Sequence, residues 1–247
     1  MSSDSLFTTM AGLQASTANM QALSSNLANT ATTGYQAIQV ATEASPYTGG
    51  NAPSGADAVA LTPNPNLTPG PLTQTGDPLD VALGGDAWLQ VQTPNGDALT
   101  RDGSLQVTNA GILADANGNP VLNVSGQPIS VPAVTKLTIG EDGTVSGTLA
   151  SQPNAAPESF GQIGLVSTPS GVLTPISGTL FSPPAGATLT PSADGSLHQG
   201  YLNQSNVDAT QAMMDLINDS RSYQLQTTML KTQSGNNDAL NTLLTQG

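Results

Sequence analysis

The chain has 247 residues, no cysteine, and only four basic side chains against 17 acidic ones, which gives a formal net charge of −13. This balance argues against binding to nucleic acid, whose phosphates need a basic patch, and against binding to an anionic membrane surface. The lack of cysteine excludes disulfide bonds and thiolate chemistry, and no apolar run is long enough to predict a membrane-spanning helix.

The first segment, residues 1–34, is predicted to be an assembly helix with one narrow apolar seam. Leu6, Leu13, Met20 and Leu27 recur every seven residues, which is the spacing of a coiled coil. Residues 6–27 carry no charge, although a coiled coil in water usually has Lys and Glu beside its seam. So little apolar surface does not stabilise an isolated helix, and we therefore expect this helix to be buried in an assembly.

Residues 35–76 are expected to form an extended segment and a linker. Gly34 offers a left-handed position for the turn that ends the first helix. The stretch 45–71 is rich in Pro, Gly, Asn and Ala and has neither a helical nor a strand period.

Residues 77–199 show the short, regularly spaced strands of a central all-β domain, sandwich-like or barrel-like. Asn95-Gly96 and Glu141–Gly143 are hairpin turns between strands. The predicted strands are residues 79–83, 88–92, 98–100, 104–108, 112–114, 120–124, 128–131, 137–139, 144–146 and 163–167.

The last segment, residues 200–247, is predicted to be a second assembly helix. Asp208 is its expected N-cap, with Gln211 three residues later as in a capping box. Leu216, Tyr223, Leu230 and Leu244 share one heptad position of its seam. Met213 stands at the other heptad position, and Ile217 widens the seam on one side. The predicted fold class is α+β, with the two terminal helices pairing as a coiled coil. The competing interpretation is ordinary packing of two helices inside one compact protein.

Two sequence features imitate catalytic or metal sites. His198 is the single histidine, so no histidine cluster for zinc and no Cys–His pair can form. Asp115, Asn117 and Asn119 match the first ligands of a calcium loop, but Pro120 stands where that loop needs glycine. We therefore expect no metal and no cofactor, and we interpret residues 115–119 as an ordinary turn.

Asp77, Asp80 and Asp86 lie near Trp88, a combination that glycosidases use. Turn and capping roles explain these short carboxylates better. The alternative from another class is thus a secreted glycan-binding or glycan-cleaving β-domain. Release of muropeptides by the protein, lost in Asp86→Asn, would support it.

Both ends of the chain resemble known signatures. Residues 25–35, SNLANTATTGY, look like the N-terminal signature of bacterial flagellar rod and hook proteins. Residues 200–208, GYLNQSNVD, with 213–217 and 221–223, look like their C-terminal signature. Residues 78–83, 86–89 and 100–103 resemble the β-domain of rod proteins, and 120–122 with 126–132 look most like the proximal-rod member. The distal-rod member is the near alternative.

The resemblance implies a non-enzymatic structural subunit of the flagellar basal-body rod. It implies partners that are copies of itself and other rod subunits, export without a signal peptide through the flagellar type III apparatus, and a periplasmic location after export. Asn203, Gln211 and Gln224 depart from it, because the signature usually has acidic residues at these positions. The assembly interface is expected at Leu6, Met10, Leu13, Met20, Asn26, Leu27, Asn29, Gly34, Tyr35, Ser205, Asn206, Val207, Asp208, Met213, Leu216, Ile217, Arg221, Tyr223, Leu230 and Leu244.

Overall fold

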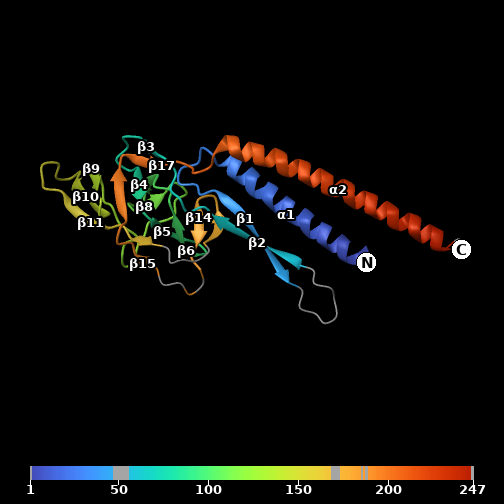
Figure 1. Ribbon diagram of the computed structural model, residues 1–247. Coiled ribbons are helices and arrows are strands. Elements are labelled where there is room, and N and C mark those ends of the chain that lie inside the picture. Colours follow the sequence, from blue (N-terminus) through green and yellow to red (C-terminus); the bar gives the residue numbers. More distant parts are fainter. Residues whose placement is uncertain (1, 47–55, 168–172, 185, 187–188, 246–247) are drawn as a thin grey trace. The chain divides into compact units, whose positions relative to one another are not determined.

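The computed structural model describes residues 2–46, 56–167, 173–184, 186 and 189–245 (Figure 1). Within these ranges, the side chains of residues 2–8, 42–46, 56–61 and 237–245 are outside the description. The chain divides into two compact units. A helical unit comprises Met1–Ala28, Ile38–Asn64 and Asp208–Gly247, and a β unit comprises Asn29–Ala37 and Pro65–Val207.

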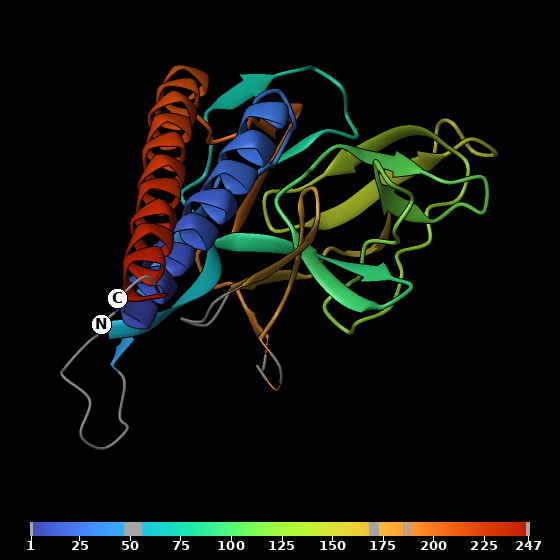
Figure 2. The same cartoon turned by 90° about the vertical axis from the view of Figure 1, so that its right-hand side faces the viewer.

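The helical unit contains α1 (Ser2–Ala28) and α2 (Ala209–Thr245), which run side by side (Figures 1 and 2). It also contains a two-stranded sheet of β1 (Ile38–Pro46) and β2 (Ala56–Pro65). Asp208 caps α2 as predicted, because its Oδ1 accepts the backbone N–H groups of Thr210 at 2.8 Å and Gln211 at 3.1 Å. The Gln211 side chain instead donates to Asp215, so the reciprocal half of the capping box does not form.

The prediction that α1 and α2 pair as a coiled coil is wrong, although the α+β class is confirmed. A coiled coil buries two positions of each heptad. Three residues at the position beside the main seam, Met10, Thr17 and Met213, are exposed. The buried side chains on α1 are Ser16 and Asn26, which lie outside the predicted seam. Polar contacts take the place of interlocking apolar side chains: Ser16 donates to Asp219 at 3.1 Å. The seven-residue spacing therefore marks no continuous apolar core between these helices.

The β unit consists of one larger sheet, one smaller sheet and several ribbons. A six-stranded sheet has the order β13-β14-β6-β5-β12-β15, and a three-stranded sheet has the order β11-β10-β9. Two-stranded ribbons pair β16 with β4, β17 with β3 and β7 with β8. The strands are β3 (Leu72–Gln74), β4 (Val81–Gly84), β5 (Ala87–Thr93), β6 (Gly96–Thr100), β7 (Leu105–Val107), β8 (Leu113–Asp115), β9 (Val134–Ile139), β10 (Thr144–Leu149), β11 (Glu158–Gln162), β12 (Leu165–Ser167), β13 (Thr174–Ser177), β14 (Leu180–Ser182), β15 (Thr190–Pro191), β16 (Ser196–Gln199) and β17 (Tyr201–Asn203).

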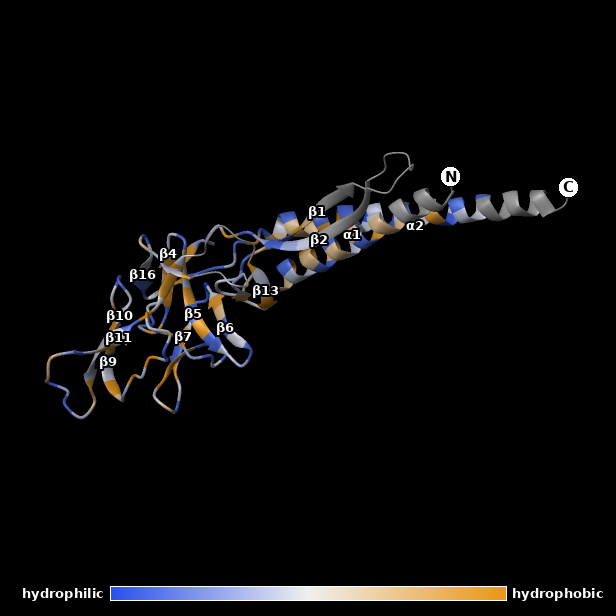
Figure 3. Cartoon of the chain, turned by 90° about the horizontal axis from the view of Figure 1, so that it is seen from below, coloured by the Kyte–Doolittle hydropathy of each residue, from blue (hydrophilic) through white to orange (hydrophobic). Residues whose placement is uncertain are grey.

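The core of the protein lies in the β unit. A large cluster includes Leu89 and Val91 of β5, and a smaller one gathers around Trp88 and Phe181. Because neighbouring residues of β5 enter different clusters, both faces of this strand are buried. Figure 3 shows hydrophobic residues in β4 and β5 and a mixture of hydrophobic and hydrophilic residues along the helices.

The predicted hairpins at Asn95-Gly96 and at Gly143 are confirmed by the antiparallel pairings of β5 with β6 and of β9 with β10. Residues 35–76, expected to be an extended segment and a linker, contain β1, which begins in the part expected to be extended, and also β2 and β3. Residues Ser196–Gln199 form β16 and Tyr201–Asn203 form β17. Among the described residues, neither helix is apolar enough over a sufficient length to cross a membrane.

Candidate assembly interface

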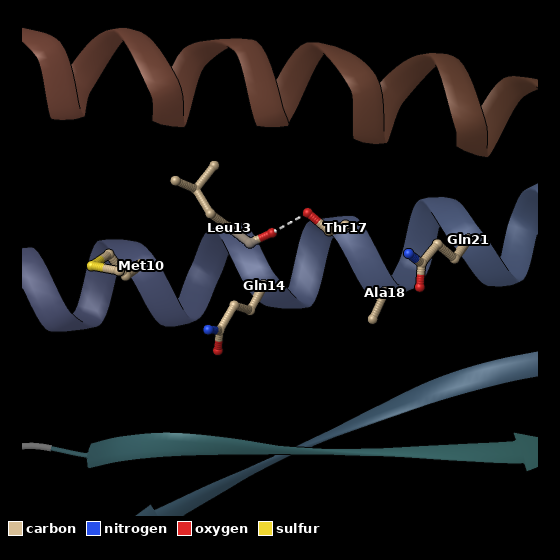
Figure 4. A pocket seen from close by; sticks show the side chains of 6 residues that line it. All are labelled: Met10, Leu13, Gln14, Thr17, Ala18 and Gln21. Atoms are coloured by element: carbon tan, nitrogen blue, oxygen red, sulfur yellow. Dashed lines mark hydrogen bonds between the residues drawn. The ribbon is translucent and has the colours of Figure 1, made fainter.

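The predicted seam of α1 is only partly covered. Leu13, Met20 and Leu27 are half-buried, whereas Met10 is 48% exposed. A hollow of about 440 Å³ lies along this helix and is lined by Met10, Leu13, Gln14, Thr17, Ala18 and Gln21 (Figure 4). Leu13 points toward α2, whereas Gln14 and Ala18 point toward the strands on the other side (Figure 4). The side chain of Leu6 lies outside the described residues.

Most of the exposed large apolar side chains on the described part of α2 lie four residues apart, and Met214, which is 49% exposed, lies outside this row. Met213, Ile217, Leu225 and Met229 are 48%, 53%, 68% and 68% exposed, and Arg221 occupies the remaining step of the four-residue spacing. Residues four apart are neighbours on a helix surface, and each such step turns by about 40° around the axis, so these side chains form a row that winds along α2, here called the α2 stripe. Leu216, Tyr223 and Leu230 of the predicted seam are half-buried beside it, and the side chain of Leu244 lies outside the described residues.

Three chain segments that are far apart in sequence meet inside the β unit, and we call them the signature clasp: residues 33–37, 66–70 and 203–206. The Gly34 N–H donates to the Asn203 carbonyl at 2.8 Å, and the Asn206 N–H donates to the Tyr35 carbonyl at 3.3 Å. The Asn66 N–H donates to the Ala37 carbonyl at 2.7 Å. The two sequence signatures therefore contact each other within one molecule.

The predicted interface residues near the clasp are mostly covered. Tyr35 and Ser205 are buried, Val207 is half-buried, and Asn29 accepts a hydrogen bond from Thr32. In the helical unit, the buried amide of Asn26 pairs with both backbone groups of Ile38, with each bond 2.8 Å long. These residues thus already have contacts inside the chain.

Two glycines of the clasp leave no room for a side chain. Gly34 has a φ of 68°, and a Cβ there would lie 2.3 Å from the backbone nitrogen of Asp102. This confirms the predicted left-handed turn and adds a steric reason for glycine. A Cβ on Gly70 would collide with the carbonyl oxygen of Gln204. The clasp is therefore closely packed at both signatures.

Asn203, one of the departures from the family signature, has an intramolecular role. Its side chain is buried, and its Oδ1 accepts the Leu83 N–H at 2.7 Å while its Nδ2 donates to the Leu83 carbonyl at 3.3 Å. An amide can make both bonds, whereas a carboxylate can accept only the first. In this chain Asn203 therefore binds β4 through an additional N–H donor that an acidic residue would lack.

A buried carboxyl group anchors the N-terminal side of the clasp. Asp102 Oδ1 accepts hydrogen bonds from Thr33 Oγ1 at 2.9 Å and from the Ser104 N–H at 3.1 Å. Burial raises the pKa of Asp102 above its ordinary value, and the nearby charges of Asp115 and Asp80 raise it further against the opposing effect of these hydrogen bonds. The group is thus more easily protonated than a surface aspartate.

Trp88 is unavailable for stacking on a sugar. Its ring is 1% exposed, meets Phe181 edge-on at 5.5 Å, and lies 5.1 Å from the guanidinium carbon of Arg101. Asp86 accepts a hydrogen bond from Ser192, and Asp77 accepts the Leu79 N–H. The arrangement that would have formed a glycan site is a packed core with capped turns.

The other imitation sites are also accounted for by local structure. The Asp115 carboxylate accepts the backbone N–H groups of Asn117 at 2.9 Å and Asn119 at 2.8 Å, and also the Asn119 side chain at 2.8 Å. These bonds close a turn at the end of β8. His198 is exposed on β16, where it pairs with Ala82 of β4.

The sequence did not indicate several contacts of the clasp. Asn66, Thr68, Asp102 and Leu83 take part through backbone groups or through a single carboxylate. Their partners are 69 to 140 residues away, so no local spacing points to them. The clasp residues that did have a signal are Gly34, Tyr35, Ser205 and Asn206, because they lie within the two sequence signatures.

The helices expose apolar side chains, and the β unit packs both chain signatures together. This combination is typical of a subunit that associates with other subunits. Comparison with known proteins agrees with this class. Residues 82–147 match the model "Flagellar hook protein FlgE/F/G D1 domain", and residues 198–243 match "Flagellar basal body rod FlgEFG protein C-terminal".

Curated relatives align over almost the whole chain. The flagellar basal-body rod protein FlgF of Escherichia coli is 36% identical, and that of Salmonella typhimurium is 34% identical, with 97% of each chain covered. The rod protein FlgG of Buchnera aphidicola subsp. Schizaphis graminum is 31% identical, over 92% of this chain and 95% of the relative. The chain belongs to the flagellar basal-body rod protein family. It is a structural, non-enzymatic subunit of the rod in the flagellar basal body, and it assembles with other rod subunits.

Proposed function

We propose that this chain is the proximal-rod subunit of its family. Two observations support this position. Residues 120–122 and 126–132 resemble the proximal-rod member, FlgF. The relatives named FlgF from Escherichia coli and Salmonella typhimurium align with this chain over 97% of their length. The FlgG relative, at 31% identity, favours the distal rod as the second candidate.

The proposed mechanism is mechanical. Helices of neighbouring subunits pack into a tube that transmits motor torque, and the β units form its outer wall. The observation that carries this proposal is the α2 stripe, whose apolar side chains are 48% to 68% exposed along the helix on both sides of Arg221. Grouped exposed apolar side chains are typical of surfaces that bind a partner. A contact between two different faces of successive copies leaves a free face at each end, which permits a growing helical array.

The predicted interface residues divide into two groups in this proposal. Side chains on α1 and α2, such as Met10 and Ile217, make the contacts between subunits. Clasp residues such as Gly34 and Ser205 hold the β unit in the form that the assembly uses. We also propose export through the flagellar type III apparatus and assembly in the periplasm, both supported by family membership.

Labelled cysteines test the position in the rod, because the natural chain has none. Val124→Cys places a thiol on a side chain that is 62% exposed in the β unit. Gold-labelled, isolated basal bodies should carry the label at the proximal part of the rod in electron micrographs. Label confined to the distal part would reject the proximal position and identify the distal-rod candidate.

Cross-linking tests the contact between helices. A chain that carries Met10→Cys and Leu225→Cys should form ladders of linked subunits in isolated rods after treatment with a short thiol cross-linker. The matched control carries Met10→Cys and Val124→Cys, which places the second thiol on the β unit. Equal ladders from both chains, or ladders from neither, would contradict assembly through the helical faces.

A further inference from the structure

The chain passes between the helical unit and the β unit four times, after Ala28, Ala37, Asn64 and Val207. If these four connections were independent, a force on one of them would act on that connection alone. The β unit instead holds its ends of these connections together. The side chain that joins three of these ends is Asn206, which lies just before the last passage and binds residues beside the second and third.

Every polar atom of the Asn206 side chain binds a residue beside another passage. Its Oδ1 accepts the N–H of Ala37, the last β-unit residue before the second passage, at 2.7 Å. Its Nδ2 donates to the carbonyl of Asn66, just after the third passage, at 2.8 Å and to the carbonyl of Thr68 at 2.7 Å. A longer contact of 3.3 Å reaches Gln36 Oε1.

Backbone hydrogen bonds of the clasp complete this connection. The Asn66 N–H binds the Ala37 carbonyl, so the second and third passages are joined directly as well as through Asn206. The segment that follows the first passage is held by the bond from the Gly34 N–H to the Asn203 carbonyl. All these residues belong to the β unit, and the four passages therefore start from one hydrogen-bonded cluster.

This pattern differs from that of an asparagine that only closes a turn. Asn123 also accepts two backbone N–H groups, from Ser125 and Gln127, but these partners are two and four residues away. The partners of Asn206 are 138 to 170 residues away, and they lie beside passages between units. Hydrogen bonds between distant segments restrict their relative movement, which a local turn does not.

We propose that Asn206 is a positioning residue for torque transmission: it joins the chain passages where they enter the β unit, so that a load is shared among them. The proposal rests on the torque-carrying role proposed above. It assigns Asn206 to the inside of the subunit and gives it a task in the finished rod. Without Asn206, we expect rods to form but to deform or break under load.

The first test uses the purified full-length chain with Asn206→Ala, Asn206→Asp and the control Asn123→Ala. Amide hydrogen exchange at Ala37 should accelerate about tenfold or more in Asn206→Ala, because its acceptor is lost. Asn206→Asp keeps that acceptor and loses the donors to Asn66 and Thr68, so it serves if the alanine variant fails to fold. Exchange in β5 and β6 should match the natural chain in all three proteins.

The second test measures motility. Cells with Asn206→Ala or Asn206→Asp should build rods in normal number and rotate normally without load, but lose rotation in viscous medium or when tethered to a large bead. Asn123→Ala should behave as the natural chain does. A folded Asn206 variant that builds no rods, or one that rotates normally under load, overturns the proposal. Failure of the assembly proposal has a separate sign: Leu225→Asp cells would then build normal rods.

Discussion

The two units of this protein differ in where they bury apolar surface. The β unit surrounds Leu89, Val91 and Trp88 with its own strands and leaves them at most 1% exposed. The helical unit leaves Leu225 and Met229 at 68% exposed and joins its helices partly through the polar pair Ser16 and Asp219. Stability of the single chain therefore comes mainly from the β unit, whereas the helices leave apolar side chains exposed.

The strongest test of this contrast is a charge in the core of the β unit. Leu105 on β7 is 5% exposed, so Leu105→Asp should lower the free energy of unfolding by about 3 kcal/mol or more. Urea denaturation of the purified monomer measures the change. Val107→Asp is the control, because this residue of the same strand is 38% exposed and should lose less than about 1 kcal/mol. Equal losses would show that the core is not where the structure has it.

The next effect concerns the clasp. Gly34→Ala introduces a Cβ 2.3 Å from a backbone nitrogen at a φ of 68°, which should cost about 2 kcal/mol or more. Gly76→Ala has a similar φ of 77° with no atom within 4 Å, so only the backbone strain of about 1 kcal/mol should appear. The difference between the two thermal midpoints measures the tight packing of the clasp. A Gly76 variant as unstable as the Gly34 variant would argue against that packing.

A smaller effect comes from the buried carboxyl group of Asp102. Its pKa is raised in the folded chain, so the folded state binds the proton more tightly than the unfolded state does. The stability contributed by this group is present at low pH and is lost as the pH rises through the raised pKa. Asp102→Asn should therefore be more stable than the natural chain at neutral pH, and this advantage should disappear on acidification.

Asp142 provides the opposite case for the same measurement. Hydrogen bonds from Thr144 lower the pKa of this exposed carboxyl group, so its contribution is present above the ordinary value and is lost as the pH falls. At each pH, the urea midpoint of each variant is compared with that of the natural chain. As the pH falls, this difference should change in opposite directions for Asp102→Asn and Asp142→Asn. Parallel curves would contradict the assignment of Asp102 to a buried site.

The smallest effect on the monomer should accompany the largest effect on assembly. Leu225→Asp changes a side chain that is 68% exposed, so the thermal midpoint of the monomer should stay the same while rods and motility are lost. Gln224→Glu is the control, because it adds a charge beside the α2 stripe at a position where the resembling signature has Glu. Motile Leu225→Asp cells with complete rods would remove the α2 stripe from the assembly interface.

The sequence predicted elements whose signals are local. The Asn95-Gly96 hairpin, the Asp208 cap and the Gly34 turn each depend on a few neighbouring residues with defined backbone preferences. The coiled coil failed because heptad spacing is the same for a buried seam and for an apolar face left open. Which one forms here depends on polar pairs such as Ser16 with Asp219, which are 203 residues apart.

The candidate site was predictable in its residues and not in its connections. The family signatures located Gly34, Ser205 and Asn206, since signature residues are recognised from their order alone. The partners of Asn206 in the clasp are the backbone carbonyls of Asn66 and Thr68, which a residue of any type could equally provide. Such contacts cannot be predicted from composition or periodicity.

The packing of Trp88 has a spectroscopic consequence. It is the single tryptophan of the chain, and it lies in the β unit, buried against Phe181 and beneath the Arg101 guanidinium. Its fluorescence therefore reports the environment of the β unit alone, without a contribution from tryptophan in either helix. Emission should shift to longer wavelength when that unit opens to water and should hold its wavelength while helices associate. One optical signal can thus follow the β unit independently of the helical unit.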